Sequence, residues 1–136
     1  MSEKEHDFGQ LQHKWDALFN RHRLTLVTHG NEKVLQFFEE LHIVSGTQKK
    51  DSYKLFLENK YGTCRLTVSF IADSFWQLDI DSDKRELLYF TDLGVRMCTP
   101  EWGLSSKQET QLVPFFQEIR RFIQIAAKDN QLLHYV

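Results

Sequence analysis

The sequence predicts an α+β domain in which a central antiparallel meander of four to five strands is packed against two N-terminal helices and one long C-terminal helix. Apolar residues recur at three- and four-residue steps near both ends of the chain, as in amphipathic helices. The middle of the chain alternates with the period of two that is typical of strands, and its short connections favour antiparallel neighbours. The 136 residues are expected to form a single domain spanning residues 1–136.

The first helix is predicted over residues 8–22, with Asp7 as its N-cap. Its apolar stripe consists of Phe8, Leu11, Trp15, Leu18 and Phe19. Residues 24–28 (LTLVT) are short and partly β-branched, so the sequence allows an edge strand or a connecting segment there.

A second helix is predicted over residues 31–42, because Gly30 and Asn31 can end the preceding segment and cap the new helix. Its apolar face consists of Val34, Phe37, Phe38 and Leu41. Residues 45–52 are polar and are expected to form a loop.

The strands of the meander are predicted at residues 53–58, 64–70, 75–80 and 86–91, with a fifth at 95–98. Adjacent residues of a strand point to opposite faces of the sheet, yet Phe75 and Trp76 are both apolar, and so are residues 87–90. This part of the sheet is therefore expected to be covered on both sides. Either the helices are divided between the two faces, or a second chain covers one of them.

The last helix is predicted to begin near Ser105 or Ser106, where Ser106 and Glu109 have the spacing of a capping box, and to end at residue 129. Pro114 should kink this helix or separate its first turn, because proline lacks an N–H and crowds the preceding turn. The apolar face consists of Leu112, Phe115, Phe116, Ile119, Phe122, Ile123 and Ala126. The tail, residues 131–136, is apolar enough to dock on the rest of the domain.

Charge and composition exclude several classes of partner. The net charge is −2 and the pI is about 6.3, so nothing favours binding to nucleic acid or to an anionic membrane. No apolar run approaches the roughly 20 residues that span a bilayer. Two cysteines, without a larger disulfide framework, are typical of reduced thiols, and a cytoplasmic protein is expected.

No residue pattern predicts a metal or a cofactor. Asp79, Asp81 and Asp83 resemble the start of an EF-hand loop. Lys84 and Phe90, however, stand where that loop needs glycine and glutamate, which favours a charged hairpin turn. The six histidines do not have metal-ligand spacing, and no glycine-rich phosphate loop occurs.

An enzyme would most plainly use Cys98, which follows a predicted strand, or a carboxylate, but no catalytic signature surrounds this cysteine. Cys64 lies within a predicted strand. Both Cys64 and Cys98 are expected to be small apolar residues of the core.

The function predicted from these observations is a non-catalytic protein-interaction module, of an adaptor, chaperone-like or regulatory kind. Its partner would be another protein or the chain itself in a homodimer. The expected anchors are Trp76, Tyr89 and Trp102, since Trp and Tyr are enriched at binding hot spots. For Trp102 the alternative is a ring folded back on the core. The alternative function is a small-ligand sensor, with a pocket between the sheet and the last helix lined by Phe115 and Phe122.

Overall fold

The computed structural model of the chain describes residues 8–50, 52–72, 75–82, 85–91, 94–98, 100–128 and 134–135. It describes only the backbone of residues 70–72, 75, 76, 85, 89, 90, 94–98, 128, 134 and 135.

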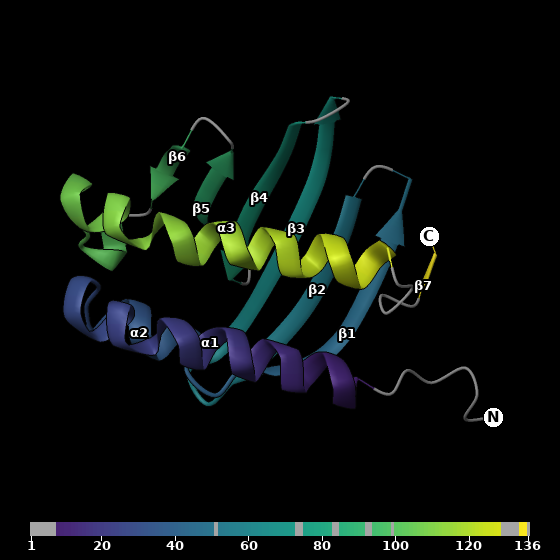
Figure 1. Cartoon of the computed structure of the whole chain (residues 1–136), viewed down its shortest axis with the longest axis horizontal. Coiled ribbons are helices and arrows are strands. Elements are labelled where there is room, and N and C mark those ends of the chain that lie inside the picture. The colour runs from purple at the N-terminus through teal and green to yellow at the C-terminus, as the bar shows by residue number, and fades with distance from the viewer. Residues whose placement is uncertain are drawn as a thin grey trace.

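Three α-helices and a seven-stranded sheet make up the fold (Figure 1). The helices are α1 (Gly9–His29), α2 (Glu32–Phe38) and α3 (Ser106–Lys128), with a 3-10 turn, η2, at Pro100–Trp102. The strands are β1 (His42–Lys49), β2 (Ser52–Asn59), β3 (Gly62–Ala72), β4 (Phe75–Ser82), β5 (Arg85–Thr91), β6 (Gly94–Cys98) and β7 (His134–Tyr135). The order across the sheet is β6-β5-β4-β3-β2-β1-β7. The predicted α+β meander with two N-terminal helices and one long C-terminal helix is confirmed.

The antiparallel meander is longer by one strand than expected. Residues 45–52, predicted as a loop, contain most of β1, which pairs with β2 from His42↔Glu58 to Lys49↔Ser52. Backbone pairing with β2 stabilises this strand, and its side chains do not show the alternation that marks a buried strand. At the edge of the sheet, β7 pairs in parallel with Thr47 and Gln48, so part of the tail docks as predicted.

Residues 24–28 are the last turns of α1, and the edge strand allowed there is wrong. Leu26 is fully buried and extends the stripe of Leu11, Trp15 and Leu18, whereas Leu24 is 76% exposed. The segment therefore follows helical periodicity. Gly30 ends the helix: its N–H still donates to the carbonyl of Leu26, but its ψ of −144° leaves the helical path.

The second helix is shorter than predicted and stops at Phe38. Glu40 has a φ of 55°, a left-handed conformation that ends the helical path before β1 begins. The predicted cap is confirmed: the side chain of Asn31 accepts the N–H of Val34 at 3.0 Å.

In α3 the capping box lies one residue earlier than expected. Ser105 Oγ accepts the N–H of Gln108 at 3.1 Å, and Gln108 Oε1 accepts the N–H of Ser105 at 2.8 Å. Pro114 lies inside a single helix and does not split off a first turn.

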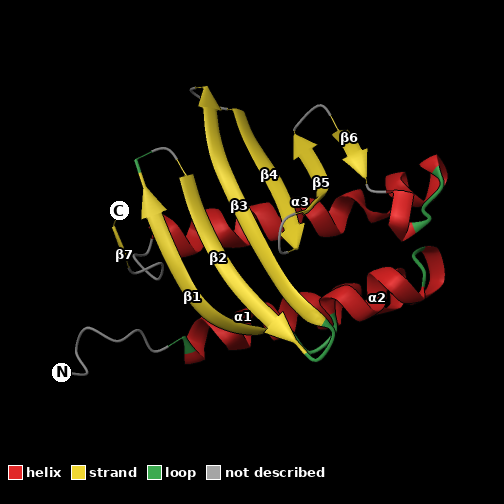
Figure 2. Cartoon of the chain, turned by 180° about the vertical axis from the view of Figure 1, so that it is seen from behind, coloured by secondary structure: helices red, strands yellow, loops and turns green. Residues whose placement is uncertain are grey.

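All three helices lie on one face of the sheet (Figures 1 and 2). Their apolar faces and the inward-facing strand residues form one buried cluster, which includes Trp15, Phe38, Leu66, Leu88 and Phe115. Leu87 is also buried in it, because a register shift between Ile80 and Asp81 lets Leu87 and Leu88 both join the core. The helices are thus not divided between two faces, and Figure 2 shows the opposite side, called the open face below, without a helix over it.

Candidate functional site

One hollow on the described surface lies beside α2. It has a volume of about 440 Å³ and is lined by Lys33, Gln36, Phe37, Tyr61, Glu101 and Trp102. A second depression of about 500 Å³ shares Lys33, Gln36 and Trp102 with it and extends toward Asn31 and Gly103. Together the two depressions form one elongated site, called the α2 hollow below. Both volumes are within the range of small-ligand and side-chain pockets.

Local hydrogen bonds place η2 against α2. The side-chain Nδ2 of Asn31 donates to the carbonyl of Trp102, while the Oδ1 of the same amide caps α2. Gly103 follows with a φ of 65°, a conformation that favours glycine and turns the chain toward α3. One asparagine therefore fixes both the start of α2 and the loop that bears the tryptophan.

The ring of Trp102 forms the floor of the α2 hollow. Trp102 is only 4% exposed, and its ring centroid lies 5.5 Å from that of Phe37 and 6.0 Å from that of Phe38. The ring is thus packed on the core, which is the alternative that the sequence allowed. Its contribution to a binding surface is limited to the part that lines the hollow.

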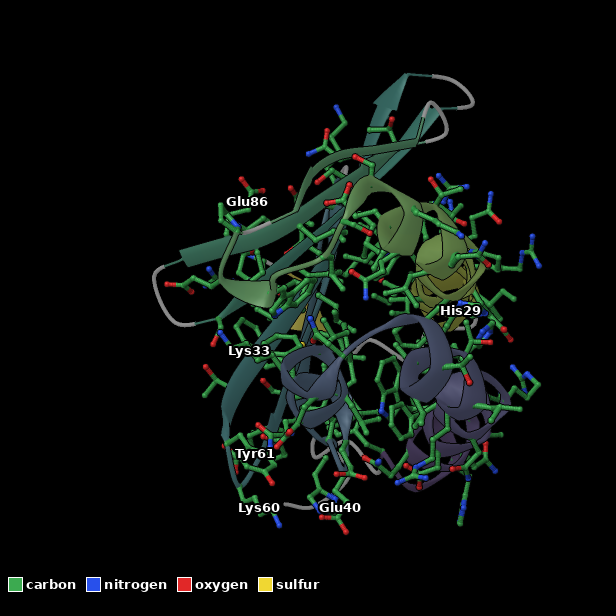
Figure 3. The ribbon with its side chains drawn as sticks, turned by 90° about the vertical axis from the view of Figure 1, so that its left-hand side faces the viewer. His29, Lys33, Glu40, Lys60, Tyr61 and Glu86 are labelled. Carbon is green, nitrogen blue, oxygen red and sulfur yellow. The ribbon has the colours of Figure 1, made fainter. Side chains whose placement is uncertain are left out.

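Tyr61 lines the wall of the α2 hollow and is 52% exposed. It lies in the turn between β2 and β3, with the Lys60 Nζ 5.2 Å from the centroid of its ring. Figure 3 shows Tyr61 and Lys60 at the same end of the molecule as Glu40, with Lys33 also on this side. The side-chain Nδ2 of Asn59 ties this turn to α2 by donating to the carbonyls of Gln36, Phe37 and Glu39.

The polar groups of the α2 hollow are of mixed charge. Lys33 provides an ammonium and Glu101 a carboxylate, while Gln36 donates to Glu32 at 3.0 Å. Among the described residues, no ion pair engages the Lys33 ammonium. The hollow thus combines aromatic surface with an ammonium that is free to meet an acidic group of a ligand.

Sequence reasoning identified Trp102 but missed Tyr61, Lys33 and Gln36. Tyr61 lies between two predicted strands, and an aromatic residue in such an exposed turn is a usable signal for binding. No pattern in the sequence predicts that Lys33 and Gln36 lie near that turn. Their position depends on the hydrogen bonds that join Asn59 to the end of α2.

The other two predicted anchors lie on the sheet. Trp76 is in β4, where it pairs with Phe70, and Tyr89 is in β5, where it pairs with Asp79 and Met97. The side chains of both lie outside the described part of the structure. Neither residue belongs to an element that lines the α2 hollow.

The described side chains of the open face are mostly polar and lie in rows across the strands. The register aligns Phe56, Arg65, Asp81 and Glu86 across four strands, and it aligns Lys54, Thr67 and Asp79 in the next row. Arg65 Nε lies 3.5 Å from Asp81 Oδ2. A hollow of about 370 Å³ next to Arg65 is lined in part by Val44 and Phe56.

Three carboxyl groups lie close together at the β4–β5 side of this face. A hydrogen bond with Asp79, partial burial, and then the negative charges of Asp79 and Asp81 raise the pKa of Glu86 to about 7. Gln77 Nε2 donates to Asp79 at 2.9 Å. Figure 3 shows Glu86 on the opposite side of the sheet from His29 and the helices.

The first residues of the string that resembles a calcium loop belong to a strand. Asp79 and Asp81 lie within β4, separated by the buried Ile80, while Asp83 lies outside the described residues. Among the described side chains, no group of three or more His, Cys, Asp or Glu residues could hold a metal ion.

Of the two cysteines, the structure describes the side chain of Cys64. Burial, and then the negative charge of Asp81, raise the pKa of the Cys64 thiol far above its usual range. A thiol held in this way is a poor nucleophile, because the thiolate is the reactive form. The side chain of Cys98 lies outside the described part of the structure.

A polar contact between α1 and α3 was not foreseen. His22 Nε2 lies 2.5 Å from Glu118 Oε1, Arg21 forms an ion pair with the other oxygen, and the His22 ring lies 5.3 Å from Phe115. Burial alone would raise the pKa of Glu118, but the hydrogen bonds and positive charges of His22 and Arg21 hold it below its ordinary value. The cluster joins two helices and stabilises the fold.

No described helix is both long and apolar enough to cross a bilayer. Comparison of the chain with protein-family models, with curated proteins and with solved structures gave no match. The site is therefore interpreted from its own geometry.

Proposed function

We propose that this protein is a non-catalytic protein-interaction module, which binds another protein by taking an apolar side chain of that partner into the α2 hollow. The observation that carries the proposal is Tyr61, an aromatic residue that is 52% exposed at the wall of a hollow whose floor is Trp102. Tyr and Trp are the residues most enriched at binding hot spots.

The chemistry of the hollow suggests the kind of segment that fits it. Phe37, Tyr61 and Trp102 provide apolar surface for one large side chain. Lys33 can then pair with an acidic residue next to that side chain. The proposed partner therefore presents an apolar residue flanked by a carboxylate, on an adaptor, regulatory or client protein.

The small-ligand alternative has less support. The ring of Phe115 lies 5.0 Å from Phe38 and 5.8 Å from Phe116, and Phe122 lies 5.7 Å from Trp15. Phe115 and Phe122 were expected to line the pocket of a small ligand, but neighbouring aromatic rings occupy the space beside them. This packing favours the protein-binding function over a ligand between the sheet and α3.

The proposal is tested with a partner captured by a photo-crosslinking residue at position 61, whose affinity is then measured by calorimetry. Tyr61→Ala should weaken binding by about 1–2 kcal/mol, or roughly 5- to 30-fold. Lys33→Ala should weaken it less, mainly at low salt. Leu24→Ala and Ile125→Ala remove exposed apolar side chains from α1 and α3 and should leave the affinity unchanged. Equal affinities for wild type and Tyr61→Ala would overturn the proposal.

A further inference from the structure

Charge is divided across the open face of the sheet. Lys54 in β2 and Arg65 in β3 lie on one half, and Asp79 and Asp81 in β4 with Glu86 in β5 lie on the other. Among the described side chains, Glu58 at the end of β2 is the one carboxylate on the basic half. No described side chain of β4 or β5 adds a cation to the acidic half.

Among the described side chains, the acidic half holds more carboxyl groups than cations that approach them. Arg65 approaches Asp81 at 3.5 Å, whereas Asp79 and Glu86, which lie diagonally to one another on β4 and β5, share a hydrogen bond. Their mutual repulsion is part of what raises the pKa of Glu86 to about 7. A cation brought from outside would relieve this repulsion.

We propose that the open face binds a second copy of this chain, related by a two-fold axis that runs parallel to the strands between β3 and β4. Such an axis places β2 and β3 of one copy over β5 and β4 of the other, so each basic half meets an acidic half. An axis perpendicular to the strands would place like charges together and is disfavoured. The contact is isologous, as in most homodimers.

The size of the face permits such a dimer. The axis overlays four strands, β2 to β5. At about 4.8 Å spacing and about 23 Å length, they present roughly 440 Å² on each copy. The total of roughly 900 Å² is at the low end of the sizes of protein–protein interfaces, where weak and transient contacts lie. Phe56 and the exposed Val44 would add apolar area beside Arg65. An interface of this size, rich in charge, should be weak and sensitive to salt.

This inference does not depend on the proposed function, because the α2 hollow lies beside the helices. A partner bound in the hollow and a second copy on the open face are separable by experiment. Lys54→Glu and Glu86→Lys change only the open face, while Tyr61→Ala changes only the hollow.

The test measures the mass of the full chain by analytical ultracentrifugation across the micromolar range, at low and high salt. The wild type should form a dimer that weakens as salt rises. Lys54→Glu and Glu86→Lys should each raise the dissociation constant at least ~10-fold, because each places like charges in contact. An equimolar mixture of the two variants, and the double variant, should recover the dimer. Lys14→Glu, an exposed reversal on α1, serves as the matched control and should not change it.

Circular dichroism on every variant would show that the fold is retained. A wild-type chain that stays monomeric throughout the range would overturn the proposal. The proposal would also be overturned if neither charge reversal changed the dissociation constant of the dimer. It would equally be overturned if each variant alone lost the dimer and the equimolar mixture did not recover it.

Discussion

The side-chain Nδ2 of Asn59 donates a 2.8 Å hydrogen bond to the carbonyl of Glu39, the residue that caps the C-terminal end of α2. The same nitrogen reaches the carbonyls of Gln36 at 2.9 Å and Phe37 at 3.3 Å. The last carbonyls of a helix lack partners within it, so this amide satisfies them from another element. Its Oδ1 accepts the N–H of Tyr61 at 2.9 Å, which fixes the wall of the α2 hollow relative to the helix.

Asn59→Ala should therefore lower the free energy of unfolding by about 1–3 kcal/mol, because it leaves helix-end carbonyls without a donor. Urea denaturation measures this change. Asn20→Ala, on the exposed side of α1, should have no effect or stabilise slightly, since alanine is the better helix former. If Asn59→Ala lowered the free energy of unfolding no more than Asn20→Ala, the hydrogen bonds of Asn59 would not contribute to stability.

Glu118→Gln should reduce stability at neutral pH by less than about 1 kcal/mol, since the pair with Arg21 is partly exposed. The pKa of Glu118 is held below its ordinary value, so the stabilisation is present above the ordinary value of 4.5. It is lost as the pH falls through the lower value of the folded state. A double-mutant cycle with His22→Asn, followed by thermal unfolding from pH 3 to pH 7, measures the coupling. A coupling that stays constant over this range would contradict the assignment.

Glu86 gives a pH dependence of opposite sign. Its pKa is raised from 4.5 to about 7, so the folded chain retains a proton that the unfolded chain loses. The contribution of Glu86 to the free energy of unfolding is fully present below its ordinary pKa of 4.5. It is lost as the pH rises through its folded-state pKa of about 7.

Glu86→Gln should therefore be less sensitive than the wild type to a rise from pH 5 to pH 8. Urea titrations at low protein concentration, where dimers do not form, test this. Glu58→Gln, a change to an exposed carboxyl of the same face, is the control and should behave as the wild type. If the Glu86 variant also follows the wild-type curve, Glu86 does not carry the proton.

Cys64 should be unreactive in the native chain. In a Cys98→Ser variant, an aromatic disulfide reagent such as DTNB should not modify Cys64 until denaturant exposes it, because the thiol is buried and its pKa is raised. Modification of the folded variant at the rate of a free thiol would be incompatible with this burial.

Where sequence prediction succeeded, the signals were local and strong. The alternation of Cys64, Leu66 and Val68 predicted a strand, and all three are buried on the helix side of the sheet. Gly30 and Asn31 predicted the end of one segment and the start of a helix, and Asn31 caps α2 as expected. These features depend on residues within a few positions of one another, so periodicity and capping rules reach them.

Errors arose where tertiary contacts overrode local preference. Residues 24–28 were open to an edge strand or a connecting segment, but the buried Leu26 is part of the apolar stripe of α1. Residues 45–49 lacked an apolar pattern, but they form a strand because β2 offers its backbone groups. Two-sided apolar character in residues 87–88 arose from a bulge, which places both leucines in one core.

The sequence by itself determined the α+β class and the main helices and strands, but it left open whether Trp102 is an exposed anchor or packed on the core. Only the tertiary structure decided that all three helices share one face of the sheet, that Tyr61 and Lys33 line one hollow, and that charge divides across the open face. The physical reason is sequence distance. Periodicity records which side of an element is apolar, whereas the meeting of Asn59 with Glu39, or of Arg65 with Asp81, depends on how whole elements pack and in which register they pair.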